Sequence, residues 1–490
     1  MKKTSGILLP ISSLPSPYGI GTLGKEAYDF VDFLAASGQK LWQILPLGPT
    51  SYGDSPYQSF SSHAGNPYFI DLEGLMEEGL VERSFVESFS WGKRPDQVSY
   101  ALLFQNRFLV LREAFQKGRE QYQEELVEFQ KDNSWLSDYA LYMALKAHFG
   151  MKWWQECDDE KAKRRDPEAL EKYRSLLKED VDFYIFIQYL FFRDWKKLKA
   201  YAGEKNIRII GDVPIYVAMD SADVWAEPEL FQLDENYVPE KVSGVPPDYF
   251  NADGQLWGNP LYNWDKMKED GYAWWKRRFQ SAGKLYDIVR FDHFRGLEMY
   301  YAVPYGETTA RNGEWVDGPK RSFVDEMNRA FPDIEFMAED LGYLTQGVID
   351  LLAASTWPGM RILQFAFDTR ESADFKPEGY TWNTVAFTGT HDNSTMVGWL
   401  AAAAKEDVEA AMEYLQVTTP EEIPEALILK GMECASKYFI VPLQDYLGLG
   451  DEARINTPGT TGINWLWRVS PETDWKALEA KVKRLGTARA

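Results

Sequence analysis

The sequence predicts an α/β fold, an eight-stranded (β/α)8 or TIM barrel with inserted, largely helical subdomains. Two observations carry this prediction. The chain contains eight short apolar runs of the kind that form buried parallel strands. Helical patterns separate most of these runs, and this alternation fits a closed barrel better than an open doubly wound sheet. The length of 490 residues is compatible with about three domains or with one decorated barrel, and we expect one barrel over residues 1–490.

The first strand–helix–strand unit opens the chain. Residues 6–11 (GILLPI) form an apolar run, and residues 41–47 (LWQILPL) form the next one. Between them, a helical face is predicted before Gly38 by the spacing of Ala27, Phe30, Val31 and Leu34. A strand–helix–strand unit of this kind normally pairs its strands in parallel through a right-handed crossover.

Six further runs complete the predicted barrel. They cover residues 208–217, 286–292, 334–340, 361–367, 384–392 and 438–444. Helical patterns lie between them, for example at residues 345–355 and at the Ala/Glu-rich residues 401–415.

Two intervals are too long to be simple crossovers. Residues 48–206 begin with a loop of small, polar and aromatic residues and then become charged and helical, which predicts an N-terminal substrate loop followed by an inserted helical subdomain. Residues 218–284 contain a stretch rich in Pro, Gly, Asp and aromatic residues. That stretch is too long for an ordinary turn, so we expect an inserted binding loop, called here the 250s loop.

The composition excludes several classes of function. A net charge of −22 argues against nucleic acid and against an anionic membrane surface as partners. The two cysteines, Cys157 and Cys434, are far apart, and the four histidines show no ligand spacing, so we expect neither a disulfide framework nor a metal or other cofactor. The short apolar start is broken by Pro10, and no apolar stretch approaches the roughly 18 residues of a membrane span, so we expect a cytoplasmic location.

Three carboxylates at predicted strand ends are candidates for chemistry. Arg290 and Asp292 lie two positions apart on one strand, so both side chains leave the same face and the arginine can hold the carboxylate ionised. Glu339 ends an apolar strand, where partial burial would raise its pKa. Asp392 follows His391 at the end of another strand. Any one of them could instead cap a helix or form an ion pair, but the carboxyl end of a barrel is where active sites lie.

Two other residues near these carboxylates have alternative interpretations. Asp212 ends a fourth strand, where nearby Pro214 favours a structural role as much as a functional one. His293 follows Asp292 and is either a core histidine or a substrate contact.

The carboxylates and the aromatic residues together point to carbohydrate chemistry. One ionised and one protonated carboxyl group are the equipment for cleaving a glycosidic bond, and a separation of about 5 to 5.5 Å would indicate a covalent intermediate. Sugar sites combine aromatic surfaces with dense hydrogen-bonding groups. Aromatic residues make up 15% of the chain, and residues 52–68 and the 250s loop mix them with Gly, Pro, Ser and Asn.

The motifs, taken in order, resemble those of the amylomaltase or disproportionating-enzyme family of 4-α-glucanotransferases. The resemblance covers nearly the whole chain and rests on PSPYGIGTLG, WQILPLGPTSYGDSPYQSFSSHAGNPY, GDVPIYVAMDSADVW, GVPPDYF with GQLWGNPLY, VRFDHFRG, AEDLG, GTHDN and INTPGTTGINWLWR. It implies a single catalytic barrel without a C-terminal β-sandwich. It also implies that the chain acts on α-1,4-glucans by a retaining mechanism.

The resemblance also implies roles for individual residues. Asp292 would be the nucleophile, Glu339 the acid/base and Asp392 the transition-state stabiliser. The expected substrate contacts are Tyr57, Asp212, Asp248, Gln255, Trp257, Arg290, His293, His391 and Asn456. Tyr52 is a weaker match to a second glucan-binding surface of the family.

Two rival functions remain open at this point. An α-amylase-like hydrolase would use the same carboxylates with water as the acceptor, and only the resemblance favours transfer between a glucan donor and a glucan acceptor. A non-catalytic glucan-binding protein on a barrel scaffold is the other alternative. It is disfavoured because such a protein has no need for three strand-end acids.

Overall fold

Eight parallel strands close into a barrel in the computed structural model, which describes residues 3–489 except 52, 249–250, 343 and 369–374. Their order around the barrel is β1-β12-β11-β10-β9-β6-β3-β2. The strands are β1 Thr4–Leu8, β2 Leu41–Gln43, β3 Arg208–Val213, β6 Ile288–Phe291, β9 Glu335–Ala338, β10 Gly359–Ile362, β11 Thr384–Phe387 and β12 Tyr438–Pro442. The predicted (β/α)8 barrel is confirmed.

Each predicted apolar run overlaps one barrel strand. The strands are almost entirely buried because helices cover the outer face of the barrel while side chains fill its interior. Strand β1 pairs in parallel with both β2 and β12, which closes the ring. Most runs extend beyond the carboxyl end of their strand, where the chain leaves the sheet but stays buried.

Helices follow most strands and pack around the barrel. They include α1 Lys25–Ala36, α12 Ala273–Leu285, α13 Lys320–Ala330, α14 Gln346–Ser355, α15 Met396–Ala402, α16 Lys405–Leu415, α17 Ile423–Glu433, α18 Leu443–Leu447 and α19 Trp475–Gly486. The helical pattern predicted over residues 401–415 is divided, because Ala403 and Ala404 are extended between α15 and α16. After β12 the described residues contain no further strand.

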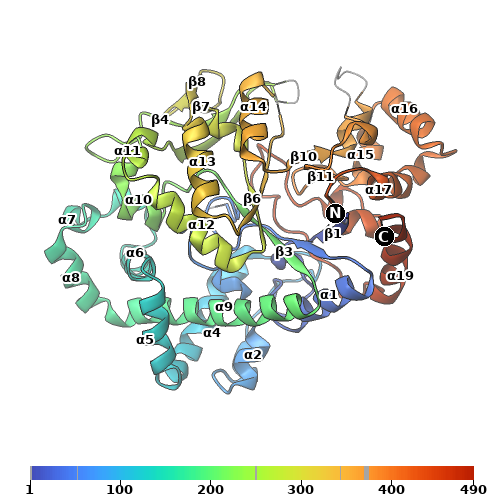
Figure 1. The fold of residues 1–490 in the computed structure, drawn as a ribbon. Coiled ribbons are helices and arrows are strands. Elements are labelled where there is room, and N and C mark those ends of the chain that lie inside the picture. The colour runs from blue at the N-terminus through green and yellow to red at the C-terminus, as the bar shows by residue number, and fades with distance from the viewer. Residues whose placement is uncertain (1–2, 52, 249–250, 343, 369–374, 490) are drawn as a thin grey trace.

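A helical segment lies between β2 and β3. Its helices are α2 Leu72–Glu77, α3 Arg83–Glu87, α4 Tyr100–Gln121, α5 Gln123–Asp132, α6 Leu136–His148, α7 Glu160–Lys163, α8 Pro167–Leu176 and α9 Lys178–Glu204. The long helix α9 contacts α4, α5, α6 and α8 and also touches α1 and β3 (Figure 1). It therefore joins these helices to the barrel wall.

A second, antiparallel sheet lies outside the barrel. Its four strands have the order β5-β4-β7-β8. They are β4 Lys241–Val245, β5 Gln255–Pro260, β7 Met299–Pro304 and β8 Glu314–Asp317, and α10 Ala222–Ala226 and α11 Trp264–Glu269 flank the first two. The sequence predicts a binding loop in this region and no strands. In the structure, β4 and β5 form a hairpin that holds the two ends of the 250s loop together.

Candidate active site

One arginine joins two carboxylates at the carboxyl end of the barrel. Asp212 on β3 and Arg290 on β6 are direct partners in the parallel register, so their side chains leave the same face. Nη1 of Arg290 donates to Oδ2 of Asp212 at 2.6 Å and to Oδ1 of Asp292 at 2.7 Å. Arg290 and Asp212 are buried, whereas 24% of the Asp292 side chain is exposed. Asp292 is therefore the member of this group that a ligand can reach.

Glu339 lies beside this group. Phe291 of β6 and Ala338 of β9 are register partners, so Asp292 and Glu339 follow at the same level of neighbouring strands. The Glu339 carboxyl group accepts the backbone N–H groups of His293 and Leu341, each at 2.8 Å. Burial, together with the charge of Asp292, raises the pKa of Glu339 to about 8, although Arg290 opposes this. Glu339 therefore keeps a proton at neutral pH.

Asp392 is held by side chains from two segments. Its Oδ1 accepts from Nδ2 of Asn456 at 2.6 Å, and its Oδ2 lies 3.3 Å from Nε2 of His391. Burial lowers the pKa of His391, which is therefore neutral near pH 7. The Asp392 side chain is 41% exposed, so it can contact a ligand as well as these partners.

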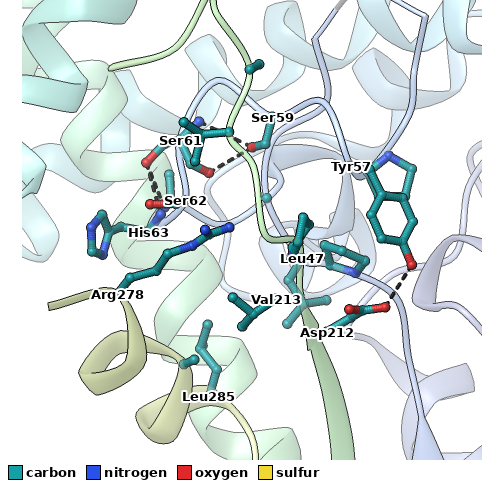
Figure 2. Close-up of a pocket in the computed structure, with 18 of the residues that line it drawn as sticks. Leu47, Tyr57, Ser59, Ser61, Ser62, His63, Asp212, Val213, Arg278 and Leu285 are labelled. Carbon is teal, nitrogen blue, oxygen red and sulfur yellow. Dashed lines mark hydrogen bonds between the residues drawn. The ribbon is translucent and has the colours of Figure 1, made fainter. Parts of the chain in front are cut away.

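Tyr57 connects the group around Arg290 with the group around Asp392, through Asp212 and His391. Its hydroxyl donates to Oδ2 of Asp212 at 2.7 Å and lies 3.0 Å from Nε2 of His391. The Tyr57 ring stacks on the imidazole of His391 with 5.3 Å between centroids. Figure 2 shows Tyr57 and Asp212 facing each other at one end of a cavity of about 50 Å³. A residue from the loop after β2 thus contacts residues from β3 and from the end of β11.

Two aromatic rings are in contact at His293, whose backbone N–H binds Glu339. The indole of Trp257 contacts the imidazole of His293 edge-on, with 4.8 Å between centroids, and its Nε1 donates to Oε1 of Gln255 at 3.1 Å. His293 has a positive φ of 55°, which turns the chain so that its N–H reaches Glu339. Burial lowers the pKa of His293 to about 4, so the ring is neutral.

The remaining predicted contacts lie in the 250s loop or outside the described residues. Asp248 is exposed between β4 and β5, and its Oδ1 accepts from the backbone N–H of Asn251 at 2.7 Å. Tyr249 and Phe250, which the sequence also places in this loop, and Tyr52 are not among the described residues.

Two residues that support Asp392 escape the sequence prediction. Arg454 donates from Nη2 to the backbone carbonyl of Asp392 at 2.6 Å and from Nε to that of Asn456 at 2.8 Å. Asp445 accepts the N–H of Met396 at 2.7 Å and the hydroxyl of Thr388 at 2.6 Å, which fixes both ends of the loop that carries Asp392. No local sequence pattern marks either residue, because most of their partners lie about 50 to 60 positions away in the sequence.

The described residues contain no group of three or more His, Cys, Asp or Glu side chains placed to hold a metal ion. Among the described helices, none is long and apolar enough to cross a membrane.

A closed parallel barrel with a protonated, buried carboxyl group beside an ionisable one defines a class of barrel enzymes equipped for glycosidic bond chemistry. Within this class, the chain belongs to the 4-alpha-glucanotransferase family, whose family model matches residues 9–474. The resemblance seen in the sequence motifs is confirmed.

Individual relatives cover nearly the whole chain. The 4-alpha-glucanotransferase of Clostridium butyricum is 47% identical over 478 residues, which are 97% of this chain and 98% of the relative. The 4-alpha-glucanotransferase of Thermus thermophilus is 45% identical, and the match covers 96% of this chain and 95% of the relative. Among solved structures, an amylomaltase from Streptococcus agalactiae in complex with acarbose is 42% identical, has a TM-score of 0.96, and is matched over 99% of its length and 100% of this chain.

Proposed function

We propose that this chain is a 4-α-glucanotransferase that transfers α-1,4-glucan segments between maltooligosaccharides or longer glucans derived from starch or glycogen. The observation that carries the proposal is the placement of Glu339 beside Asp292, with a pKa of about 8 for the glutamate and an arginine on the aspartate. One group is ready to give a proton while the other is ready to attack.

In the first step, Glu339 gives its proton to the glycosidic oxygen while a carboxylate oxygen of Asp292 attacks the anomeric carbon. The bond between that carbon and the glycosidic oxygen breaks, and the reducing-end portion of the donor leaves with a new hydroxyl group. A covalent glucosyl ester on Asp292 remains. Nη1 of Arg290 holds the attacking carboxylate in place through a hydrogen bond of 2.7 Å to its Oδ1.

In the second step, Glu339 takes a proton from the 4-hydroxyl of an acceptor glucan, whose oxygen attacks the same carbon. The ester bond breaks, Asp292 is released as a carboxylate, and a new α-1,4 bond forms. Asp392, oriented by Asn456 and His391, is placed to bind the sugar hydroxyls and stabilise the positive charge that develops on the ring.

We assign the surrounding residues to glucan binding. Tyr57 and His391 would contact the sugar in the cleavage site, where Asp212 and Arg290 fix the geometry. His293, Trp257 and Gln255 form a connected wall that reaches Glu339 through the backbone N–H of His293. With Asp248, the wall and the 250s loop would hold the acceptor and exclude water, which competes for the ester.

Incubation of the protein with maltotriose alone tests the proposal. We expect glucose together with a ladder of longer maltooligosaccharides, because each transferred segment lengthens another chain. Glucose and maltose alone would indicate the hydrolase alternative, and unchanged maltotriose would indicate a binding protein. Glu339→Gln should abolish the ladder.

A matched control lies on the same strand. Glu335 begins β9 at the other end of the barrel, where it accepts hydrogen bonds from Lys437 and Tyr438, each at 2.6 Å. Glu335→Gln therefore makes the same chemical change away from the site, and the folded variant should keep the ladder. A ladder from Glu339→Gln protein would remove Glu339 from its proposed role.

A further inference from the structure

A buried asparagine joins three segments of the chain near the catalytic centre. Asn259 on β5 is 4% exposed. Its Nδ2 donates to the backbone carbonyl of Val217, in the loop after β3, at 2.9 Å and to Oε1 of Gln58 at 3.3 Å. Its Oδ1 accepts from Nε2 of Gln58 at 3.2 Å and from Oγ of Ser243 on β4 at 3.3 Å. Two donated and two accepted bonds are the full capacity of this side chain, so the whole amide is used to hold the segments together.

The strand that carries Asn259 is irregular at this point. The pairing of β4 with β5 shifts register here, so that residues 257–259 lie opposite the single residue Ser243. Gly258 has a φ of 77°, and the backbone N–H of Asn259 donates to Oγ of Ser243 at 3.2 Å. Bulges of this kind re-aim side chains and are common next to active sites. Here both the backbone and the side chain of Asn259 bind neighbouring segments.

Gln58 connects Asn259 to residues around the reacting groups. It directly follows Tyr57, whose hydroxyl binds Asp212. Nε2 of Gln58 also donates to the backbone carbonyl of Trp257 at 3.4 Å. The Trp257 ring contacts His293, whose backbone N–H binds the proposed acid/base. The side chains of Gln58 and Asn259, called here the amide junction, therefore tie the segment of Tyr57 to the wall that contains Trp257.

We propose that Asn259, acting with Gln58, is a positioning residue that decides how the glucosyl ester is divided between a sugar acceptor and water. The inference rests on the proposed function, in which this wall and the 250s loop hold the acceptor and exclude water. The buried Asn259 amide acts through Trp257 and Gln58. Both outcomes share the first step, because the ester on Asp292 forms before a sugar hydroxyl or water attacks the same carbon. A looser wall therefore admits water without preventing cleavage of the donor.

Counting reducing ends during incubation with maltotriose tests the junction. A transfer breaks one α-1,4 bond and forms another, so the number of reducing ends stays constant, whereas each hydrolysis adds one. Gln58→Met keeps the length of the side chain and removes its hydrogen bonds to Trp257 and Asn259. We expect the share of hydrolysis to rise by about 10-fold, while total donor cleavage falls by less than about threefold.

A second variant tests whether the two amides act as one unit. Asn259→Ala should also raise the share of hydrolysis. Adding Gln58→Met to Asn259→Ala should change that share by less than about twofold, because the junction is already broken. Effects of the two substitutions that simply multiply would contradict a shared junction. If Asn259→Ala does not fold, Gln58→Met alone decides the result.

Gln232→Met is the matched control. Gln232 is also half-buried, and its Nε2 donates to the carbonyl of Tyr262 at 2.9 Å and to the hydroxyl of Tyr300 at 3.1 Å. The same substitution there removes hydrogen bonds next to the antiparallel sheet and leaves the amide junction intact. It should keep the share of hydrolysis of the parent. An unchanged share in folded Gln58→Met, or an equal rise in Gln232→Met, would overturn the proposal.

Hydrogen–deuterium exchange separates this inference from the proposed function, because it needs no turnover. Gln58→Met should speed exchange of the backbone N–H groups of residues 255–260 by about 10-fold relative to the parent, and Gln232→Met should not. Equal exchange in the parent and Gln58→Met would overturn the positioning role. A parent protein that forms no ladder from maltotriose would instead contradict the proposed function, and the exchange result would still decide whether the junction holds the wall.

Discussion

Arg290 and Asp212 are direct partners across β6 and β3, and their side chains form a buried ion pair with an N–O distance of 2.6 Å. The same Nη1 atom holds Asp292 at 2.7 Å. Because the register of two barrel strands sets this geometry, the position of the proposed nucleophile is fixed by the sheet and not by a flexible loop.

Removal of this arginine should affect both activity and stability. Arg290→Met leaves two carboxylates without their cation, so we expect kcat/KM for maltotriose to fall by about 100-fold or more. The free energy of unfolding should fall by about 3–5 kcal/mol. Assays of transfer and urea unfolding measure the two effects.

Arg208→Met is the control for this prediction. Arg208 binds Glu335 at 2.6 Å at the amino end of the barrel, and its side chain is 43% exposed. The variant should therefore lose less stability and keep the specific activity of its folded fraction. Equal losses of activity in the two variants would contradict a special role for Arg290.

The rate of transfer should depend on the protonation of Glu339. The first step needs its proton, so we expect the rate to fall as pH rises through about 8, whereas an ordinary glutamate would have lost its proton near pH 4.5. Initial rates from pH 5 to 10 at fixed ionic strength measure this. Circular dichroism over the same range checks that the protein stays folded. A rate that already falls between pH 5 and 6 would contradict the assignment.

The same proton should make stability depend on pH. Between about pH 4.5 and pH 8, the folded protein keeps a proton on Glu339 that the unfolded chain has lost, so the contribution of this group falls as pH rises. Glu339→Gln cannot ionise. The stability of this variant relative to the parent should therefore increase from pH 5 to 8.5, which a comparison of the two Tm values measures. The difference in the free energy of unfolding should change by at most about 1.4 kcal/mol for each pH unit.

Glu335→Gln should behave in the opposite way. Burial works against it, but hydrogen bonds from Lys437, Tyr438 and Arg208 lower the pKa of Glu335 below its ordinary value. The ionised form therefore stabilises the fold above about pH 4.5. Its loss in Glu335→Gln should lower Tm by an amount that stays nearly constant from pH 5 to 8.5. A parallel pH trend in both glutamine variants would contradict the explanation.

Arg454 should act as a positioning residue for Asp392. Arg454→Met removes the hydrogen bonds to the backbone carbonyls of Asp392 and Asn456. We expect kcat to fall by about 10- to 100-fold, with a smaller change in KM, because small displacements of a stabilising carboxylate are costly in the transition state. Arg454→Lys should recover part of kcat. Arg484→Met, which removes an exposed pair with Glu425, should leave kcat unchanged.

The barrel could be predicted because its strands are buried on both faces. Such strands are apolar almost throughout, so they are visible as runs in the sequence. Two strands of the outer sheet, β4 and β5, lack that signal. Their sequences, KVSGV and QLWGNP, contain Gly or Pro, and β4 is paired with the distant strand β7 as well as with β5.

The site was partly predictable for a related reason. Asp292 and Glu339 stand out because each interrupts an apolar run at a strand end, and the structure brings them to neighbouring positions. The contacts of Tyr57 with Asp212 and His391 join residues separated by 155 and 334 positions, which no local pattern records. Only the resemblance to a family indicated Tyr57.

Those long separations in sequence also set the order in which parts of the chain can fold. Barrel helices form from neighbouring residues, whereas the contacts of Tyr57 require the loop after β2, strand β3 and the end of β11 to be in place together. During refolding from urea, we therefore expect the helical signal to recover before transfer activity does. A chain that has already regained its secondary structure would still be an incomplete catalyst until this loop docks.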